Sequence, residues 1–225
     1  MSWLFTFLLT LMVRAIVVVT TLPVHEFAHG YVAYRMGDPT AKYQGRLTLN
    51  PLAHLDLFGT IMLMFTGFGF AKPVPINPYN FKKPKVGMAL TALAGPVANV
   101  LLALVVAVVY KLLVLLIAAA GLYYNEMLTT FLGLLRQIVY VSVGLAVFNL
   151  LPVPPLDGSR IAALFLKERT YFKIMQYENY IFIALFVLLF TGILDKPLNI
   201  VTGWVYNFIN FATSPLDLLI RAVLH

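Results

Sequence analysis

The chain has 225 residues, of which 61% are hydrophobic and 11% are charged, and its formal net charge is +7. Soluble domains carry about 25% charged residues, so this composition excludes an ordinary water-soluble globular protein. The absence of cysteine excludes disulfide and thiol chemistry. We interpret the basic excess as loops that hold the cytoplasmic side of a membrane, and not as a surface that binds nucleic acid.

The first predicted element is a helix over about residues 9–36. At 1.5 Å per residue it measures about 42 Å, which exceeds the roughly 30 Å hydrocarbon core of a bilayer. Such a helix must protrude, tilt or bend, and Pro23 is the expected position of a bend. Residues 1–8 are interpreted as an additional interfacial piece. Met1–Val13 is expected to be retained, because no basic residue precedes it as in a signal peptide.

This helix contains the pattern HExxH, formed by His25-Glu26-Phe27-Ala28-His29. Residues four apart lie on one face of a helix, so both imidazoles can reach one metal ion, and neutral imidazole suits zinc. Glu26 faces the same cleft and can accept a proton from water that the metal activates. An ionisable group at mid-bilayer costs about 2.5–3.5 kcal/mol, so this cluster needs a compensating cation.

The next apolar segment is too short for a spanning helix. Leu57–Ala71 is rich in glycine, and Lys72-Pro73-Val74-Pro75 follows it directly. Basic residues lie on both sides of it, so both of its ends are expected on the cytoplasmic side. We therefore predict a short re-entrant hairpin or a small β element packed against the helices.

The remaining apolar segments predict four further spans, over about residues 86–118, 128–156, 178–194 and 197–214. The two loops richest in Lys and Arg fall within residues 35–85 and 160–173, and the positive-inside rule places both in the cytoplasm. With five spans the N-terminus lies outside and the C-terminus inside.

The expected fold is an all-α polytopic membrane protein with about five to six transmembrane helices. Residues 1–225 are expected to form a single integral membrane domain. Its catalytic core is predicted at about 9–165, and its C-terminal helices at about 178–214.

The third metal ligand must come from another element, and Asp157 is the strongest candidate. It lies at the inner end of the 128–156 span, where three prolines interrupt the helix and Gly158 permits a sharp turn. The distribution of charged loops puts this end on the cytoplasmic side, at a depth comparable to that of HExxH. Topology and ligand chemistry therefore indicate the same residue.

Two separated motifs resemble one family. HEFAH at residues 25–29 and Asn149-x-x-Pro152-x-x-x-x-Asp157-Gly158 are similar to motifs of the site-2 protease family of intramembrane zinc metalloproteases. Ala94-Gly95-Pro96-Val97-Ala98-Asn99 and the stretch Gly45–His54 resemble the same family. The resemblance covers about residues 15–165. It is closest to the compact bacterial or archaeal branch that lacks PDZ and CBS domains.

The resemblance implies a role for each matching position. His25, His29 and Asp157 match the zinc ligands, with one Zn²⁺ per chain, and Glu26 matches the general base. Asn149 matches an asparagine that steadies the substrate or the oxyanion. The implied function is hydrolysis of peptide bonds in transmembrane segments of other proteins. The implied partners are such a substrate and the lipid bilayer, the implied location is a prokaryotic plasma membrane, and homo-oligomerisation stays open.

Two alternatives use other chemistry. A membrane metalloprotease that acts on soluble loops usually takes a downstream glutamate as its third ligand, but Glu126 lies at the wrong end of its helix. A non-catalytic metal-binding or transport protein on the same fold would carry acidic residues along its spans. Beyond Glu26 and Asp157, the predicted spans offer almost none.

Four further polar residues have open interpretations. His54 is expected to be a hydrogen-bonded loop histidine oriented by Asp56, with an accessory metal ligand as the alternative. Asn99 either lines the active site or packs between helices. Lys72 is expected to extend toward the membrane interface, with substrate contact as the alternative. Arg14 has no assigned role.

Overall fold

The computed structural model describes residues 3–66, 69–122 and 125–224. All regular elements in these ranges are helices, so the all-α prediction is confirmed. In chain order they are α1 (Trp3–Arg35), α2 (Thr40–Tyr43), η1 (Pro51–Ala53), α3 (Leu57–Thr66), η2 (Pro78–Asn80), α4 (Pro84–Ala119), α5 (Glu126–Asn149), α6 (Asp157–Ala162), α7 (Glu168–Met175), α8 (Glu178–Phe190), α9 (Asp195–Ala212) and α10 (Ser214–Leu224).

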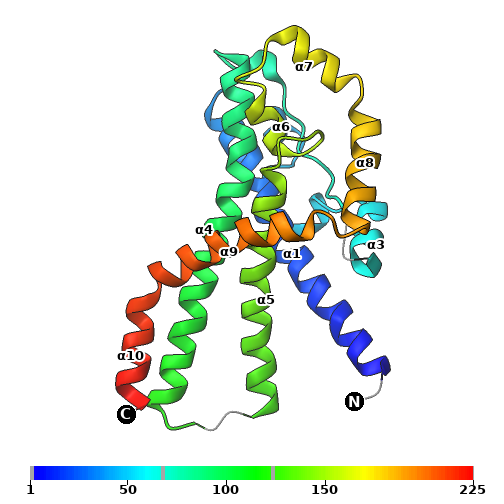
Figure 1. The fold of residues 1–225 in the computed structure, drawn as a ribbon. Coiled ribbons are helices and arrows are strands. Elements are labelled where there is room, and N and C mark those ends of the chain that lie inside the picture. Colours follow the sequence, from blue (N-terminus) through cyan, green and yellow to red (C-terminus); the bar gives the residue numbers. More distant parts are fainter. Residues whose placement is uncertain (1–2, 67–68, 123–124, 225) are drawn as a thin grey trace.

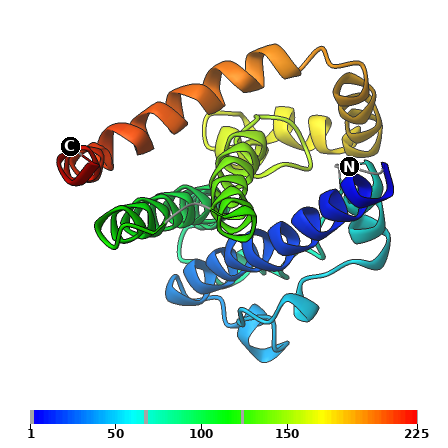
Figure 2. The ribbon, with the colours of Figure 1, turned by 90° about the horizontal axis from the view of Figure 1, so that it is seen from below.

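Three long helices form the centre of the molecule. Among the described residues, α1, α4 and α5 are long and apolar enough to cross a membrane, which fits a polytopic membrane protein. Figure 1 shows α4 running the height of the molecule, with α1 lying obliquely beside it. In the view from below, α5 lies between α1 and α9 (Figure 2). Pro23 lies inside α1, which continues through it.

The predicted number of five to six spans is not confirmed. α8 has 13 residues and measures roughly 20 Å, too short to span alone. α7 and α8 are bent by 63° relative to each other, so this pair is either one broken span, which would be the fourth, or a re-entrant loop. The segment predicted as the last span is α9, which crosses α4 and α5 at a steep angle near mid-height (Figure 1). Its polar residues, including Asp195 and Lys196 at its start, interrupt the apolar surface that a span requires.

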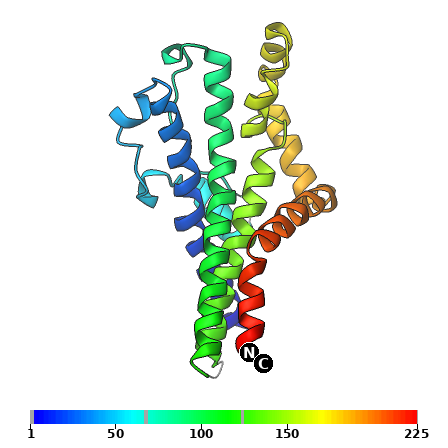
Figure 3. The same cartoon turned by 90° about the vertical axis from the view of Figure 1, so that its left-hand side faces the viewer.

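The two ends of the chain lie at the same end of the helix bundle. α10 runs beside the lower part of α4, and its last turn lies at the same lower end of the molecule as the start of α1 but on the opposite side (Figures 1 and 3). An odd number of spans would have put the two ends on opposite sides. The difference arises because α9 runs across the bundle instead of along it.

The segment predicted as a hairpin contains a helix. Residues 57–66 form α3, whose first turn is capped where Asp56 Oδ1 accepts the Gly59 N–H at 2.9 Å. Residues 67 and 68, which belong to the predicted hairpin, lie outside the described residues, and 69–77 have no regular secondary structure. In the described part of this segment there is no β element, because its backbone groups bond to loops and side chains. One example is the Lys72 N–H, which donates to the His54 carbonyl at 2.8 Å.

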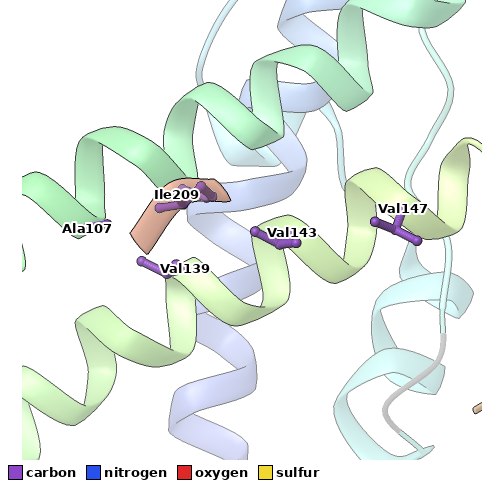
Figure 4. Close-up of a cluster of buried hydrophobic side chains, with 6 residues drawn as sticks. Ala107, Val139, Val143, Val147 and Ile209 are labelled. Atoms are coloured by element: carbon purple, nitrogen blue, oxygen red, sulfur yellow. The ribbon is translucent and has the colours of Figure 1, made fainter. Parts of the chain in front are cut away.

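Small and β-branched side chains pack α4, α5 and α9 together. The buried cluster consists of Ala103 and Ala107 from α4, Val139, Val143 and Val147 from α5, and Ile209 from α9 (Figure 4). The residues of α4 and α5 recur every four positions and so form one face of each helix. Small residues at such a face let membrane helices approach closely, so this packing holds α4 rigidly against α5.

Candidate metal centre and active-site cavity

The HExxH histidines lie one turn apart on α1. The ring centroids of His25 and His29 are 4.5 Å apart and the rings are nearly perpendicular, at 89°. Both side chains are buried, with exposed fractions of 4% and 6%. The i, i+4 spacing therefore brings both imidazoles to one point, as the sequence predicts.

Asp157 reaches the same point from the first turn of α6. Its Oδ2 lies 3.1 Å from His25 Nε2 and 3.2 Å from His29 Nε2. The three ligand atoms lie within 4.8 Å of one another. Ligands at about 2.0–2.1 Å from a tetrahedral zinc ion are roughly 3.3 Å apart, which is close to these separations. The three residues thus fit one zinc ion.

The ring nitrogens that face away from this point meet α4. His29 Nδ1 lies 2.7 Å from the Thr91 carbonyl. A carbonyl only accepts, so His29 Nδ1 carries a proton, and Nε2 is the nitrogen that faces Asp157. His25 Nδ1 lies 3.0 Å from the side-chain amide of Asn99. Such outer contacts fix the orientation of histidine ligands, and α4 supplies both of them.

Two glycines allow the elements of the site to approach one another. A Cβ added at Gly95 would lie 2.5 Å from His29 Cε1 and Nε2 and 2.6 Å from His25 Cε1. A Cβ added at Gly158 would lie 2.2 Å from the Leu150 carbonyl oxygen. The sequence predicted that Gly158 allows a sharp turn, but the positive-φ glycines of the described chain are found elsewhere. Gly158 is required instead because α6 begins in direct contact with the end of α5.

Glu26 lies beside the three ligands and is not one of them. Its side chain is 9% exposed, and Oε2 accepts the backbone N–H of Val74 at 3.1 Å. Val74 stands between Pro73 and Pro75, so it is the one residue of the three with an N–H to donate. The segment 69–77 is therefore fastened directly to the carboxylate that HExxH chemistry uses as a base.

A cavity of about 420 Å³ opens at these residues. Its lining combines polar groups with apolar side chains from α8. It includes His25, Glu26, His29, Asn149 and Asp157, then Gly69, Phe70, Ala71 and Val74 from the segment 69–77, and Phe182, Leu185, Phe186 and Leu189 from α8. The cavity therefore brings apolar side chains together with the candidate metal ligands.

The other candidate residues separate into those near the site and those away from it. Asn149 lines the cavity, but its Nδ2 donates to the Leu145 carbonyl at 3.0 Å and not to the ligand cluster. His54 is fully buried, with Nε2 at 2.7 Å from the Thr48 carbonyl, and it does not belong to the cluster. This geometry agrees with the interpretation of His54 as a loop histidine. Asp56 caps α3 instead of orienting His54.

Two residues gain partners that the sequence did not indicate. Arg14 Nη1 donates to the Met64 carbonyl in the last turn of α3 at 2.6 Å, so it fastens α3 to α1. Thr91 was not predicted at all, because it acts through its backbone carbonyl and its side-chain type carries no signal. Pro96 inside α4 is no hint to it, because the missing N–H of Pro96 leaves the Ala92 carbonyl without its helical partner and not the Thr91 carbonyl.

This fold and site define a class: a multi-pass membrane protein in which an HExxH helix and a later aspartate bring together the ligand types of a zinc peptidase. The model of peptidase family M50 matches residues 13–131 and 114–191. The chain therefore belongs to peptidase family M50, which confirms the predicted resemblance to the site-2 proteases. No solved structure matches the chain significantly.

Curated relatives carry names that agree with this family. The chain is 46% identical over 180 residues to "Putative zinc metalloprotease YwhC" of Bacillus subtilis, covering 78% of this chain and 79% of the relative. It is 28% identical over 193 residues to "Putative zinc metalloprotease Rip2" of Mycolicibacterium smegmatis, covering 84% and 70%. Both names specify zinc, which is the metal that the sequence predicts.

Proposed function

We propose that this protein is an intramembrane zinc endopeptidase that hydrolyses peptide bonds within or near transmembrane segments of membrane-protein substrates. The observation that carries the proposal is the meeting of His25, His29 and Asp157 at one point, with Glu26 beside them in a cavity that apolar side chains also line. Membership of peptidase family M50 supports the same activity.

Each polar residue of the cavity has a proposed role. His25, His29 and Asp157 would hold the zinc ion. When bound, zinc would polarise the substrate carbonyl and make water a stronger nucleophile at neutral pH. Glu26 would take a proton from that water and pass it to the leaving amine. Because the Val74 N–H already holds Glu26 Oε2, the Oε1 atom is the oxygen left to carry the proton. Asn149 would turn its amide from the Leu145 carbonyl toward the substrate.

The substrate helix must unwind locally, because helical peptide bonds are shielded and hydrogen-bonded. Gly69, Phe70 and Ala71 line the cavity and could pair with the unwound segment as an added strand. An Ala71→Pro variant removes one N–H from this edge, and we expect it to cleave more slowly. Unchanged cleavage in that variant would contradict strand pairing.

We further propose that the site opens toward the cytoplasm of a prokaryotic cell. Basic residues collect between the end of α1 and the start of α4, at the end of the bundle near the metal centre. They include Arg35, Lys42, Arg46, Lys82, Lys83 and Lys85. The positive-inside rule assigns such an end to the cytoplasm. A cysteine introduced at exposed Lys83 should react with impermeant thiol reagents only after the membrane of intact cells is permeabilised.

The test combines metal analysis with cleavage of single-span peptides by the detergent-purified protein. We expect wild type to contain one zinc per chain and to cleave, and Glu26→Gln to keep zinc while cleavage falls by about 10²–10⁴-fold. Asp157→Ala should lose zinc and activity together. Cleavage that persists in Glu26→Gln would reject the general-base role. Zinc binding in wild type without cleavage of any peptide would favour the non-catalytic alternative.

A further inference from the structure

Asn99 is a fully buried amide in the apolar helix α4. It lies one turn after Gly95, so it shares the face of α4 that contacts the histidines. Its Nδ2 is 3.0 Å from His25 Nδ1, whereas its Oδ1 is buried without a hydrogen-bond partner. A buried polar atom without a partner is costly in an apolar interior and requires an explanation.

The chemistry of His25 supplies that explanation. His25 Nε2 faces Asp157 Oδ2 at 3.1 Å and is the nitrogen that would bind zinc. A neutral imidazole that ligates through Nε2 carries its proton on Nδ1, and that proton needs an acceptor. The amide nitrogen and amide oxygen of asparagine are nearly equal in size and shape, so rotating the amide by a half-turn exchanges their positions. A half-turn of the Asn99 amide therefore puts the unpartnered Oδ1 opposite His25 Nδ1–H.

The two histidines differ in how their protons are fixed. His29 Nδ1 faces a backbone carbonyl, which only accepts, so Nδ1 of His29 carries a proton whatever its Nε2 contacts. His25 Nδ1 faces an amide, which can either donate or accept. With the amide nitrogen toward His25, the proton lies on Nε2 and is donated to Asp157. With the amide oxygen toward it, the proton lies on Nδ1 and Nε2 is free to ligate.

We propose that Asn99 is a positioning residue for the metal centre: its amide oxygen holds the Nδ1–H of His25 and thereby sets the affinity of the site for zinc. The proposal rests on the proposed zinc site but not on proteolysis. Changes to such outer hydrogen bonds typically cost about 10–100-fold in metal affinity. An aliphatic side chain at position 99 could neither accept this proton nor orient the ring.

The experiment measures zinc affinity by competition with a chromogenic chelator, using full-length protein in detergent. Asn99→Leu and Asn99→Ala should bind zinc about 10–100-fold more weakly than wild type. Asn99→Asp keeps the shape and offers only acceptors, so it should bind as tightly as wild type or more tightly. The control is Ser142→Ala, which removes the buried contact between Ser142 and Thr21 (3.3 Å) that joins α5 to α1 away from the metal ligands.

The outcomes are distinct. Equal losses in Asn99→Asp and Asn99→Leu would overturn the proposal, because they would indicate packing and not hydrogen bonding. Unchanged affinity in Asn99→Leu or Asn99→Ala would overturn it too, and so would an equal loss in Ser142→Ala. If wild type binds zinc but cleaves no peptide, the proposed protease function fails while the role of Asn99 is still tested by affinity.

Discussion

Two groups of ionisable side chains lie between apolar helices along α4, and they are neutralised in different ways. Near the N-terminal half of α4, two carboxylates and two imidazoles converge, and Asp157 Oδ2 faces the Nε2 atoms of both histidines. Farther along α4, Lys111 is 8% exposed, and its Nζ lies 2.6 Å from Asp217 Oδ2 on α10 and 3.4 Å from the Thr213 carbonyl.

The difference between the two groups lies in their charge balance. Lys111 and Asp217 form one cation and one anion, so the pair is complete and joins α10 to α4. The histidine cluster holds Glu26 and Asp157 with no lysine or arginine among its three candidate ligands, and Arg160 is the basic residue that lines the same cavity. A bound cation would offset the negative charge of this cluster. The Lys111–Asp217 pair neutralises itself and therefore has a structural role, whereas the histidine cluster has the ligand set that a metal ion requires.

The largest expected effect follows from crowding the metal centre. Gly95→Ala places a methyl group 2.5 Å from the His29 ring, and both imidazoles must move. We expect loss of zinc and a fall in peptide cleavage of at least about 100-fold, since displacements near 1 Å cost that much. The control is Gly133→Ala on α5, where no atom lies within 4 Å of the added carbon. Full zinc content in Gly95→Ala would show that the ligand cluster is not held by α4.

The second prediction separates the structural pair from the metal centre. Lys111→Met leaves Asp217 without its partner. Breaking a fully buried pair costs about 3–5 kcal/mol, but the Asp217 side chain is 43% exposed, so we expect roughly 1–2 kcal/mol. Thermal unfolding in detergent measures this loss, and the double variant Lys111→Met/Asp217→Leu should recover most of it. Zinc content should stay unchanged in the folded protein. A loss of zinc would instead link the pair to the site.

The smallest expected effect is on stability against unfolding, and it concerns a third buried carboxylate. This carboxylate is Asp38, which lies in the loop after α1. Burial alone would raise its pKa. Hydrogen bonds from the Thr40 hydroxyl, the Asn80 amide and the backbone N–H groups of Asn77 and Thr40 outweigh burial and hold the pKa below its usual value. Asp38 is thus neutralised by dipoles and not by a metal or a lysine.

The pH dependence of stability tests this assignment. Because the folded-state pKa of Asp38 is lowered, its contribution is present above the unfolded pKa of about 3.9 and is lost as pH falls through the folded value. The unfolding temperature of wild type should therefore fall more steeply on acidification than that of Asp38→Asn. Near neutral pH we expect the variant to lose less stability than Lys111→Met. Parallel acid profiles for the two proteins would exclude the proposed contribution.

Much of the fold and site was predictable where the signal is local. The apolar composition indicated membrane helices, and the spacing of His25 and His29 placed both rings on one face of a helix. The distribution of Lys and Arg predicted that Asp157 and HExxH lie at a comparable depth in the membrane. The course of α9 was not predictable in this way, because its apolar content resembles that of a span while its direction depends on packing against α4 and α5.

The sequence by itself determined the membrane environment, the peptidase family and the residues that meet at the metal centre. Only the tertiary structure decided what holds them: the Thr91 carbonyl and Asn99 behind the histidines, Gly95 against their rings, and the Val74 N–H on Glu26. The physical reason is that periodicity fixes which residues share a face of one helix. Contacts across helices depend on the rotation and crossing angle of two helices, which the packing of the whole bundle sets.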